Sequence, residues 1–306
     1  VYSGATNGWI PTLDKAVDDV PSKGNTEGIF GFGYTGPTAV TNLVSNTGVV
    51  SSDTAGVGTA RYCLAAGEYG GDKGIFGFGL TASVCDITNL VSNAGVVASD
   101  VTGVGTSRSH LAACGYGGDK GIFGFGNPGP TAVTNLVSNA GVVASDTAGV
   151  GTARYYAAAC SYGGDKGIFG FGNDGVSVCD ITNLVSNAGV VASDVTGVGT
   201  ARSGLAACGY GYDKGIFGFG DTGSHVSMTN LVSNAGVVSS DVTGVGTDRR
   251  ILAACEYGGG KGIFGFGYTP SATNVTNLVS NTGVVASDQA ATTGTGRYAL
   301  AACSFN

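Results

Sequence analysis

Six copies of one hexapeptide constrain this chain more than any other feature. Gly-Ile-Phe-Gly-Phe-Gly occurs six times, unchanged, in the 306 residues. The copies begin at Gly28, Gly74, Gly121, Gly167, Gly215 and Gly262, so the steps between them are 46, 47, 46, 48 and 47 residues. A unit of this length is too short to bury a core alone and must pack on its neighbours. We therefore expect one repeat domain over residues 28–306, preceded by an extension, residues 1–27, that matches nothing in the repeat.

The composition favours short strands joined by tight turns. The chain holds 57 Gly and 6 Pro, and 42% of its residues are hydrophobic. Glycine at this level without a three-residue period excludes collagen, and the hydrophobic fraction excludes disorder. Glycine supplies the positive φ that many tight turns require.

Each unit is expected to form four strands. In the first unit these are residues 28–33, 41–46, 49–53 and 61–66. The Asn-Thr-Gly or Asn-Ala-Gly that follows the second strand is a hairpin signal. Four strands in a unit of 46 residues fit one blade of a β-propeller.

The points at which the chain enters and leaves the repeat predict a closed ring. The chain enters the repeat at Gly28 without a preceding Leu-Ala-Ala strand, and it leaves after Leu300-Ala301-Ala302-Cys303. The C-terminal strand can therefore supply the inner strand that the first blade lacks, which removes exposed sheet edges. The expected fold is all-β: a six-bladed β-propeller of four-stranded blades, closed by the C-terminal strand, with an N-terminal extension. An open solenoid is the alternative, and it would leave both end repeats uncapped.

The segment from Arg61 to Gly79 resembles a kelch-type propeller repeat. It shares the order of an Arg, an inner strand, a turn around Gly70-Gly71-Asp72-Lys73 and a second strand ending in Gly. It departs from that family where Gly-Phe-Gly replaces a double Gly and where the Tyr and Trp of later strands are absent. The hexapeptide together with Thr-Asn-Leu-Val-Ser-Asn is also similar to uncharacterised environmental bacterial and phage proteins and to propeller subunits of fibrils recovered from fresh water. This resemblance covers residues 28–306 and implies a structural role at a surface or outside the cell.

Charge and hydropathy disfavour two classes of partner. Charged residues make up 11% of the chain and the net charge is −7, so the surface repels phosphate backbones and nucleic acid is not expected as a partner. No apolar run reaches the roughly 18 residues of a membrane span. The chain starts at Val1 and shows no signal peptide, which we interpret as a mature, processed chain or a sequence inferred from the material itself.

Three charged positions recur in the repeat. Repetition spreads each type of group around a ring, whereas catalysis requires unlike groups to converge on one point. We expect the Arg and Asp sets to pair or to cap turns within or between blades. The sets are Arg61, Arg108, Arg154, Arg202, Arg249 and Arg297; Asp53, Asp100, Asp146, Asp194, Asp241 and Asp288; and Lys73, Lys120, Lys166, Lys214 and Lys261.

Neither an enzyme site nor a cofactor site is expected. The chain has three Glu, namely Glu27, Glu68 and Glu256, and the sequence singles out no pair for the two converging carboxylates of a glycoside hydrolase, which is therefore the weakest alternative. His110 and His225 occupy different repeat positions without metal-ligand spacing, so no metal is expected.

Five of the eight Cys share one repeat position, in Ala-Ala-Cys, where the first copy has Gly67. A small buried apolar residue is the favoured interpretation, and the even count leaves disulfides open. These residues are Cys114, Cys160, Cys208, Cys255 and Cys303.

Residues 1–27 suggest how such a domain could assemble into a filament. They could add to a sheet or groove of the next subunit, as in strand donation, and a head-to-tail contact that does not close builds a filament. A short helix is expected over residues 12–20. Packing of the segment on its own propeller is the alternative. The candidate subunit-contact residues are Tyr2, Trp9, Ile10, Leu13, Val17 and Val20.

We therefore expect a homopolymeric structural subunit of an extracellular filament or a cell- or virion-surface appendage. The alternative is a propeller head on a phage or cell surface that binds a glycan or receptor through the variable loops or through a pocket between blades. Lectin-like propellers usually repeat an aromatic platform in every blade, whereas here Tyr34 and Tyr268 recur in only two of the six loops. Asn274-Val275-Thr276 is a candidate glycosylation sequon.

Overall fold

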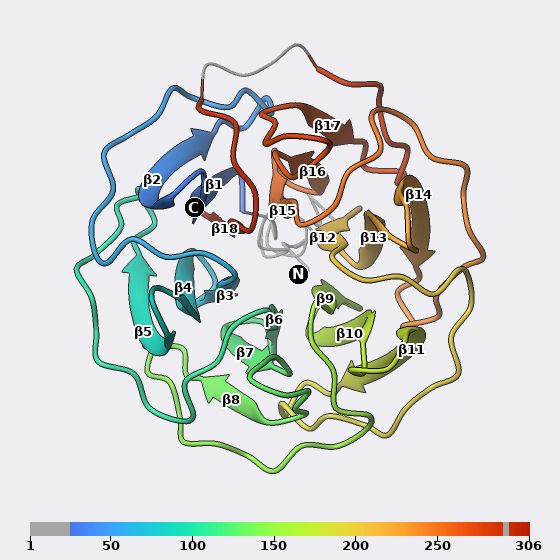
Figure 1. Cartoon of the computed structure of the whole chain (residues 1–306), viewed down its shortest axis with the longest axis horizontal. Helices are drawn as coiled ribbons and strands as arrows, with labels where there is room; N and C mark the ends of the chain where they lie inside the picture. The colour runs from blue at the N-terminus through green and yellow to red at the C-terminus, as the bar shows by residue number, and fades with distance from the viewer. Residues whose placement is uncertain (1–24, 290–293) are drawn as a thin grey trace, which may run out of the picture.

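The chain forms six antiparallel sheets of three strands each. The computed structural model describes residues 25–289 and 294–306, and within these ranges it contains strands and no helix. The sheets are arranged around a central axis (Figure 1). The strand expected at the N-terminus and the helix expected over residues 12–20 lie outside the described residues.

Each sheet has an inner strand near the axis, a middle strand and an outer strand, in that order below. Sheet 1 is β18 (Ala301–Phe305), β1 (Glu27–Tyr34) and β2 (Pro37–Val44). Sheet 2 is β3 (Ala65–Tyr69), β4 (Lys73–Leu80) and β5 (Val84–Val91). Sheet 3 is β6 (Ala112–Tyr116), β7 (Lys120–Gly124) and β8 (Thr134–Val137). Sheet 4 is β9 (Ala158–Tyr162), β10 (Lys166–Asn173) and β11 (Val178–Val185). Sheet 5 is β12 (Ala206–Tyr210), β13 (Lys214–Asp221) and β14 (His225–Val232). Sheet 6 is β15 (Ala253–Tyr257), β16 (Lys261–Gly265) and β17 (Thr276–Val279).

The first and the last strand of the described chain meet in sheet 1. Strand β18 pairs with β1 from Glu27↔Phe305 to Gly31↔Ala301, although the partners come from opposite ends of the sequence. The C-terminal strand therefore occupies the inner position that β3 occupies in sheet 2. An all-β array of six such sheets is consistent with a six-bladed propeller.

The hexapeptide explains how neighbouring sheets pack. Its first Phe is fully buried and reaches the preceding sheet at the middle Gly of the hexapeptide there: a Cβ on Gly31 would lie 2.7 Å from Cζ of Phe76. Glycine is therefore needed at this position, because the aromatic ring of the next sheet occupies the space that a side chain would fill. The same contact recurs as Gly77–Phe123, Gly124–Phe169, Gly170–Phe217, Gly218–Phe264 and Gly265–Phe30.

The second Phe of each hexapeptide adopts a left-handed backbone. Phe32 has φ 62°, and the pairing of β1 with β2 shifts register between Gly31 and Gly33, as at a β-bulge. A non-glycine residue in this region is strained, so packing must hold it there. Phe76 contacts the Phe32 ring edge-on at 5.1 Å between centroids, and the Arg61 guanidinium covers it at 4.3 Å.

The expectation of four strands per unit is wrong. Residues 49–53, expected as a strand, make only the isolated bridge Val44↔Val50. The Ser51 amide still donates to Leu43 O, but side chains replace part of the regular ladder: Asn42 Nδ2 donates to Ser51 O at 3.0 Å, and the Leu43 amide donates to Ser51 Oγ at 2.9 Å. The inner strand expected at residues 61–66 is instead Ala65–Tyr69, because Cys63 has φ 54° and interrupts the extended backbone.

Repeated hydrogen bonds connect neighbouring sheets at the two sides and between the outer segments. On one side, turn amides donate to turn carbonyls, as from Gly70 N to Asp119 O at 2.7 Å. At the opposite side, left-handed residues are linked in series, as from His110 N to Cys63 O at 2.8 Å. Between the outer segments a Thr donates to an Asp of the following sheet. The Thr–Asp pairs are Thr59–Asp100, Thr106–Asp146, Thr152–Asp194, Thr200–Asp241, Thr247–Asp288 and Thr295–Asp53.

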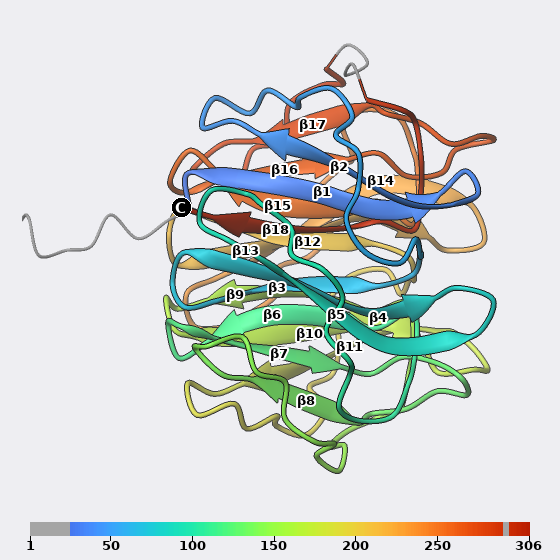
Figure 2. The same cartoon turned by 90° about the vertical axis from the view of Figure 1, so that its left-hand side faces the viewer.

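The strands run along the axis, so the molecule has two distinct ends (Figure 2). The C-terminus and the turns before β4, β7, β10, β13 and β16 lie at one end, which we call the turn end. The loops after β1 and β4 lie at the other, which we call the loop end.

Candidate functional site

The six repeated Arg residues are structural. Each is buried and stacks its guanidinium on the second Phe of the preceding hexapeptide, at 4.0 to 4.5 Å from the ring centroid. Arg154 is typical: Nε donates to Phe171 O, Nη1 to Thr152 O and Nη2 to Asn183 Oδ1. Burial lowers the pKa of Arg154 to about 10, so the group stays charged at neutral pH.

The six repeated Asp residues close the junctions between sheets, as expected of turn-capping groups. Asp100 accepts hydrogen bonds from the backbone and hydroxyl of Thr59 in the preceding unit and from Asn89 Nδ2 in its own. Partial burial would raise the pKa of Asp100, but these hydrogen bonds outweigh it and lower the pKa below its usual value.

The Lys of the turns pair locally. Lys73, Lys120, Lys166 and Lys214 each contact the Asp that precedes them in sequence, at 2.5 to 2.8 Å. These pairs are about 40% exposed, so each contributes little to stability. In sheet 6 the preceding residue is Gly260, and Lys261 instead lies 5.9 Å from the Tyr257 ring.

The five Cys of the inner strands are buried thiols, as the repeat position predicted. Each Sγ packs where the first Gly of a neighbouring hexapeptide has no side chain, as Cys255 does against Gly28. Burial raises the pKa of Cys114 to about 12, which makes the thiol unreactive at neutral pH. Cys63, Cys85 and Cys179 are also free thiols.

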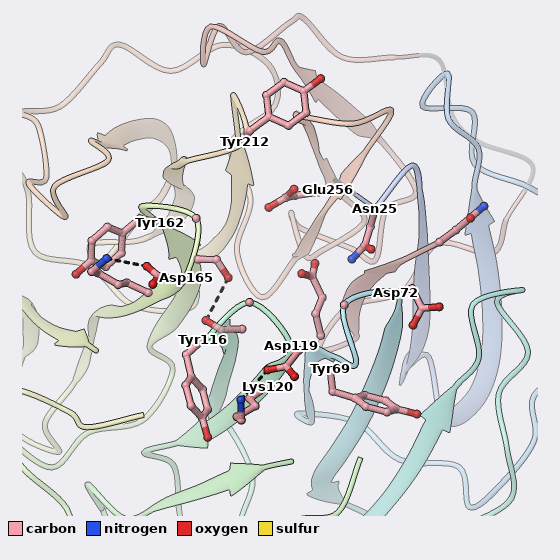
Figure 3. Close-up of a pocket in the computed structure, with 18 of the residues that line it drawn as sticks. Asn25, Tyr69, Asp72, Tyr116, Asp119, Lys120, Tyr162, Asp165, Tyr212 and Glu256 are labelled. Carbon is pink, nitrogen blue, oxygen red and sulfur yellow. Dashed lines mark hydrogen bonds and ion pairs between the residues drawn. The ribbon is translucent and has the colours of Figure 1, made fainter. Parts of the chain in front are cut away.

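A cavity of about 500 Å³ opens at the turn end of the axis. Its wall includes the Asp119–Lys120 and Asp165–Lys166 pairs together with Asn25 and Glu256 (Figure 3). Such a volume is within the range of small-ligand sites.

Two glutamates, besides the Asp residues of the turns, share this cavity, and the sequence did not single them out as a pair. Glu68 on β3 and Glu256 on β15 both line it, and the inner strand between them is β18. A Cβ on Gly209 would overlap Glu256 Oε1, so the lack of a side chain there makes room for this carboxylate. The sequence signal that could have identified this pair is the residue after Ala-Ala-Cys (Ala-Ala-Gly in the first copy), which faces the axis because side chains alternate along a strand. In the six units this residue is Glu68, Gly115, Ser161, Gly209, Glu256 and Ser304.

The loop end of the axis is narrower than the turn end. Six residues with φ between 52° and 63° form a series in which each amide donates to the carbonyl of the preceding member, and the amide of the first, Cys63, donates to the last. They surround an opening of about 70 Å³. The six are Cys63, His110, Tyr156, Gly204, Ile251 and Ala299.

We expect His110 to make the stability of the fold depend on pH. Its ring stacks edge-on with Tyr156 at 4.3 Å, and burial lowers its pKa from 6.5 to about 4. As the pH falls, the unfolded chain therefore binds a proton on His110 near pH 6.5, whereas the folded chain binds it only near pH 4. We expect the free energy of unfolding to fall by up to about 3 kcal/mol as the pH drops through this interval.

The measurement is urea unfolding between pH 4 and pH 7, on the natural chain and on His110→Tyr. Tyrosine suits the site because Tyr156 holds the equivalent position at the same φ, 55° against 54°. The variant should lose the slope between pH 6.5 and pH 4. An unchanged slope would assign the pH dependence to other groups.

The candidate contact residues of the N-terminal extension, Tyr2, Trp9, Ile10, Leu13, Val17 and Val20, lie outside the described residues. Asn274 of the sequon is partly buried, and its Nδ2 donates to Gly294 O at 2.7 Å. Glycosylation of Asn274 stays a prediction.

Residues 25–289 and 294–306 contain no group of three or more His, Cys, Asp or Glu side chains that could hold a metal ion. No helix in the same ranges is long and apolar enough to cross a membrane. Comparison of the sequence with models of known protein families and with curated proteins finds no match.

Proposed function

We propose that this protein is a structural subunit of an extracellular filament or surface appendage, and that it assembles head-to-tail through its N-terminal segment. Its six sheets are the blades of one closed β-propeller, and no nucleic acid takes part. The partner of each subunit is another copy of the same chain.

One observation carries this proposal: the six sheets are complete without the first 24 residues. Strand β1 has β18 on one side and β2 on the other, so it has no free edge for a further strand. The middle strand of each other sheet likewise has two partners. A segment that its own sheets do not require is available to bind another copy.

The place where the segment joins the domain supports a contact along the axis. Asn25 and Thr26 line the cavity at the turn end, and the Thr26 amide donates to Asn306 O at 3.1 Å. Residues 25 and 26, where the described chain begins, lie at the end of the axis and not at the rim, and an attachment point there favours a head-to-tail arrangement. Because such a contact is heterologous, repeated addition gives a filament unless the rotation closes.

The test compares the full chain with a chain that begins at residue 25. We expect both to unfold at the same temperature, because the sheets are intact, and only the full chain to form filaments in electron micrographs. Replacement of Trp9 and Ile10 by Ser in the full chain should also abolish filaments. Filaments formed by the shortened chain would refute the proposal. A lower melting temperature of the shortened chain would instead show that the segment packs on its own domain.

A further inference from the structure

The loop end carries side chains that differ between otherwise near-identical repeats. Two positions there pair across an isolated bridge: the residue after the buried Arg and the residue that follows the hexapeptide. Two of the six bridges join two large aromatic or cationic side chains, and the other four do not. The bridged pairs are Tyr62–Leu80, Ser109–Asn127, Tyr155–Asn173, Ser203–Asp221, Arg250–Tyr268 and Tyr298–Tyr34.

Four of these tyrosines form a continuous arc across sheets 6, 1 and 2. Ring centroids of Tyr34 and Tyr62 lie 4.7 Å apart, those of Tyr34 and Tyr298 lie 5.5 Å apart, and those of Tyr298 and Tyr268 lie 5.1 Å apart. All four side chains are partly exposed. These contacts, two edge-to-face and one tilted, fix the rings in place while the side chains stay partly exposed to a ligand.

The arc ends in a polar group. Arg250 lies over the Tyr268 ring at 5.7 Å, and its Nη1 contacts Asp221 Oδ2 at 3.2 Å. His225 Nε2 lies 3.6 Å from the same Asp221 oxygen. The Arg250 side chain is 40% exposed, so this guanidinium can donate to a ligand while it is held by Asp221. We call Tyr62, Tyr34, Tyr298, Tyr268, Arg250 and Asp221 together the tyrosine arc.

We propose that the tyrosine arc binds a neutral oligosaccharide of pyranose rings with equatorial hydroxyl groups. Such a ring has two apolar C–H faces, which pack on tyrosine, and an equator of hydroxyls, which match the phenol, guanidinium and carboxylate groups of the arc. The Arg250–Asp221 pair is neutral as a unit and the chain carries a net charge of −7, so polyanionic glycans are disfavoured. The arc occupies three of the six sheets, so each chain has one site. This site is independent of filament formation.

The experiment is isothermal titration of the full chain with cellohexaose and with chitohexaose. We expect saturable binding of at least one of them, with one site per chain. Tyr268→Ala and Tyr298→Ala should each weaken binding by about tenfold or more. Tyr212→Ala is the matched control, because Tyr212 is 57% exposed and lies at the turn end by the cavity, and it should bind as the natural chain does.

Circular dichroism of each variant verifies folding, and Arg250→Gln, which keeps most of the side-chain volume, replaces any tyrosine variant that fails to fold. Three results would overturn the proposal. The first is no saturable binding of either sugar at millimolar concentration. The second is equal affinity in the arc variants and in the natural chain. The third is loss of self-association in the arc variants with no sugar bound by the natural chain, which would identify the arc as a protein interface.

Discussion

A chain that ends at Tyr298 is expected not to fold. The deletion removes β18, the inner partner of β1 over Glu27–Gly31. It also removes the buried side chains of Leu300 and Phe305, each worth about 1.5 to 3 kcal/mol, and the hydrogen bond from Asn306 N to Asp72 O. The sum is comparable to the whole stability of an ordinary domain, which is about 5 to 15 kcal/mol. Circular dichroism and thermal unfolding of the shortened chain measure the loss.

A peptide of residues 299–306 supplied in trans provides the control for this deletion. If β18 acts by filling the inner position of sheet 1, the peptide should restore cooperative unfolding to the shortened chain. Deletion of residues 1–24 should have no such effect, since β1 keeps both partners. A chain without β18 that unfolds cooperatively at the natural temperature would contradict the proposed ring closure and would favour an open array.

The architecture was predictable because one unit is repeated. Six identical hexapeptides imply six equivalent environments, and the phase of the ends predicted the pairing that β18 makes with β1. The number of strands per unit was not predictable from hydropathy. Residues 49–53 have a strand-like composition, yet they make one isolated bridge, and side chains of Asn42 and Ser51 take part in the hydrogen bonds that join them to the outer strand.

The candidate sites were less predictable, because they depend on which residues of different units meet. Glu68 and Glu256 are 188 positions apart in the sequence. They share a cavity because β18, from the other end of the chain, packs between β3 and β15 and so brings these two strands to within one strand of each other. Tyr34 and Tyr298 meet only through the same pairing of the termini. The repeated residues reveal the scaffold, whereas the sites lie where the repeat is broken.

The second large effect is expected for Arg154→Met, which should lower the free energy of unfolding by about 3 to 5 kcal/mol. Methionine keeps most of the volume but leaves Phe171 O, Thr152 O and Asn183 Oδ1 without their donor. It also removes the cation from the face of Phe125, where the guanidinium lies 4.0 Å from the centroid. The substitution also removes the desolvation cost of a buried charge, and this gain offsets part of the loss. Urea unfolding at pH 7 gives the value.

Arg297 offers an internal control for that estimate. Its Nη2 and the Asn42 Oδ1 that would accept from it are both buried without a hydrogen-bond partner, whereas the equivalent atoms of Arg154 and Asn183 are 2.7 Å apart. Arg297→Met therefore sacrifices one hydrogen bond fewer, and its cost should be smaller than that of Arg154→Met by about 1 kcal/mol or more. Equal costs would mean that the hydrogen bonds contribute little. Stacking on phenylalanine, which both residues share, would then be the main stabilising contact of the buried Arg at every junction between sheets.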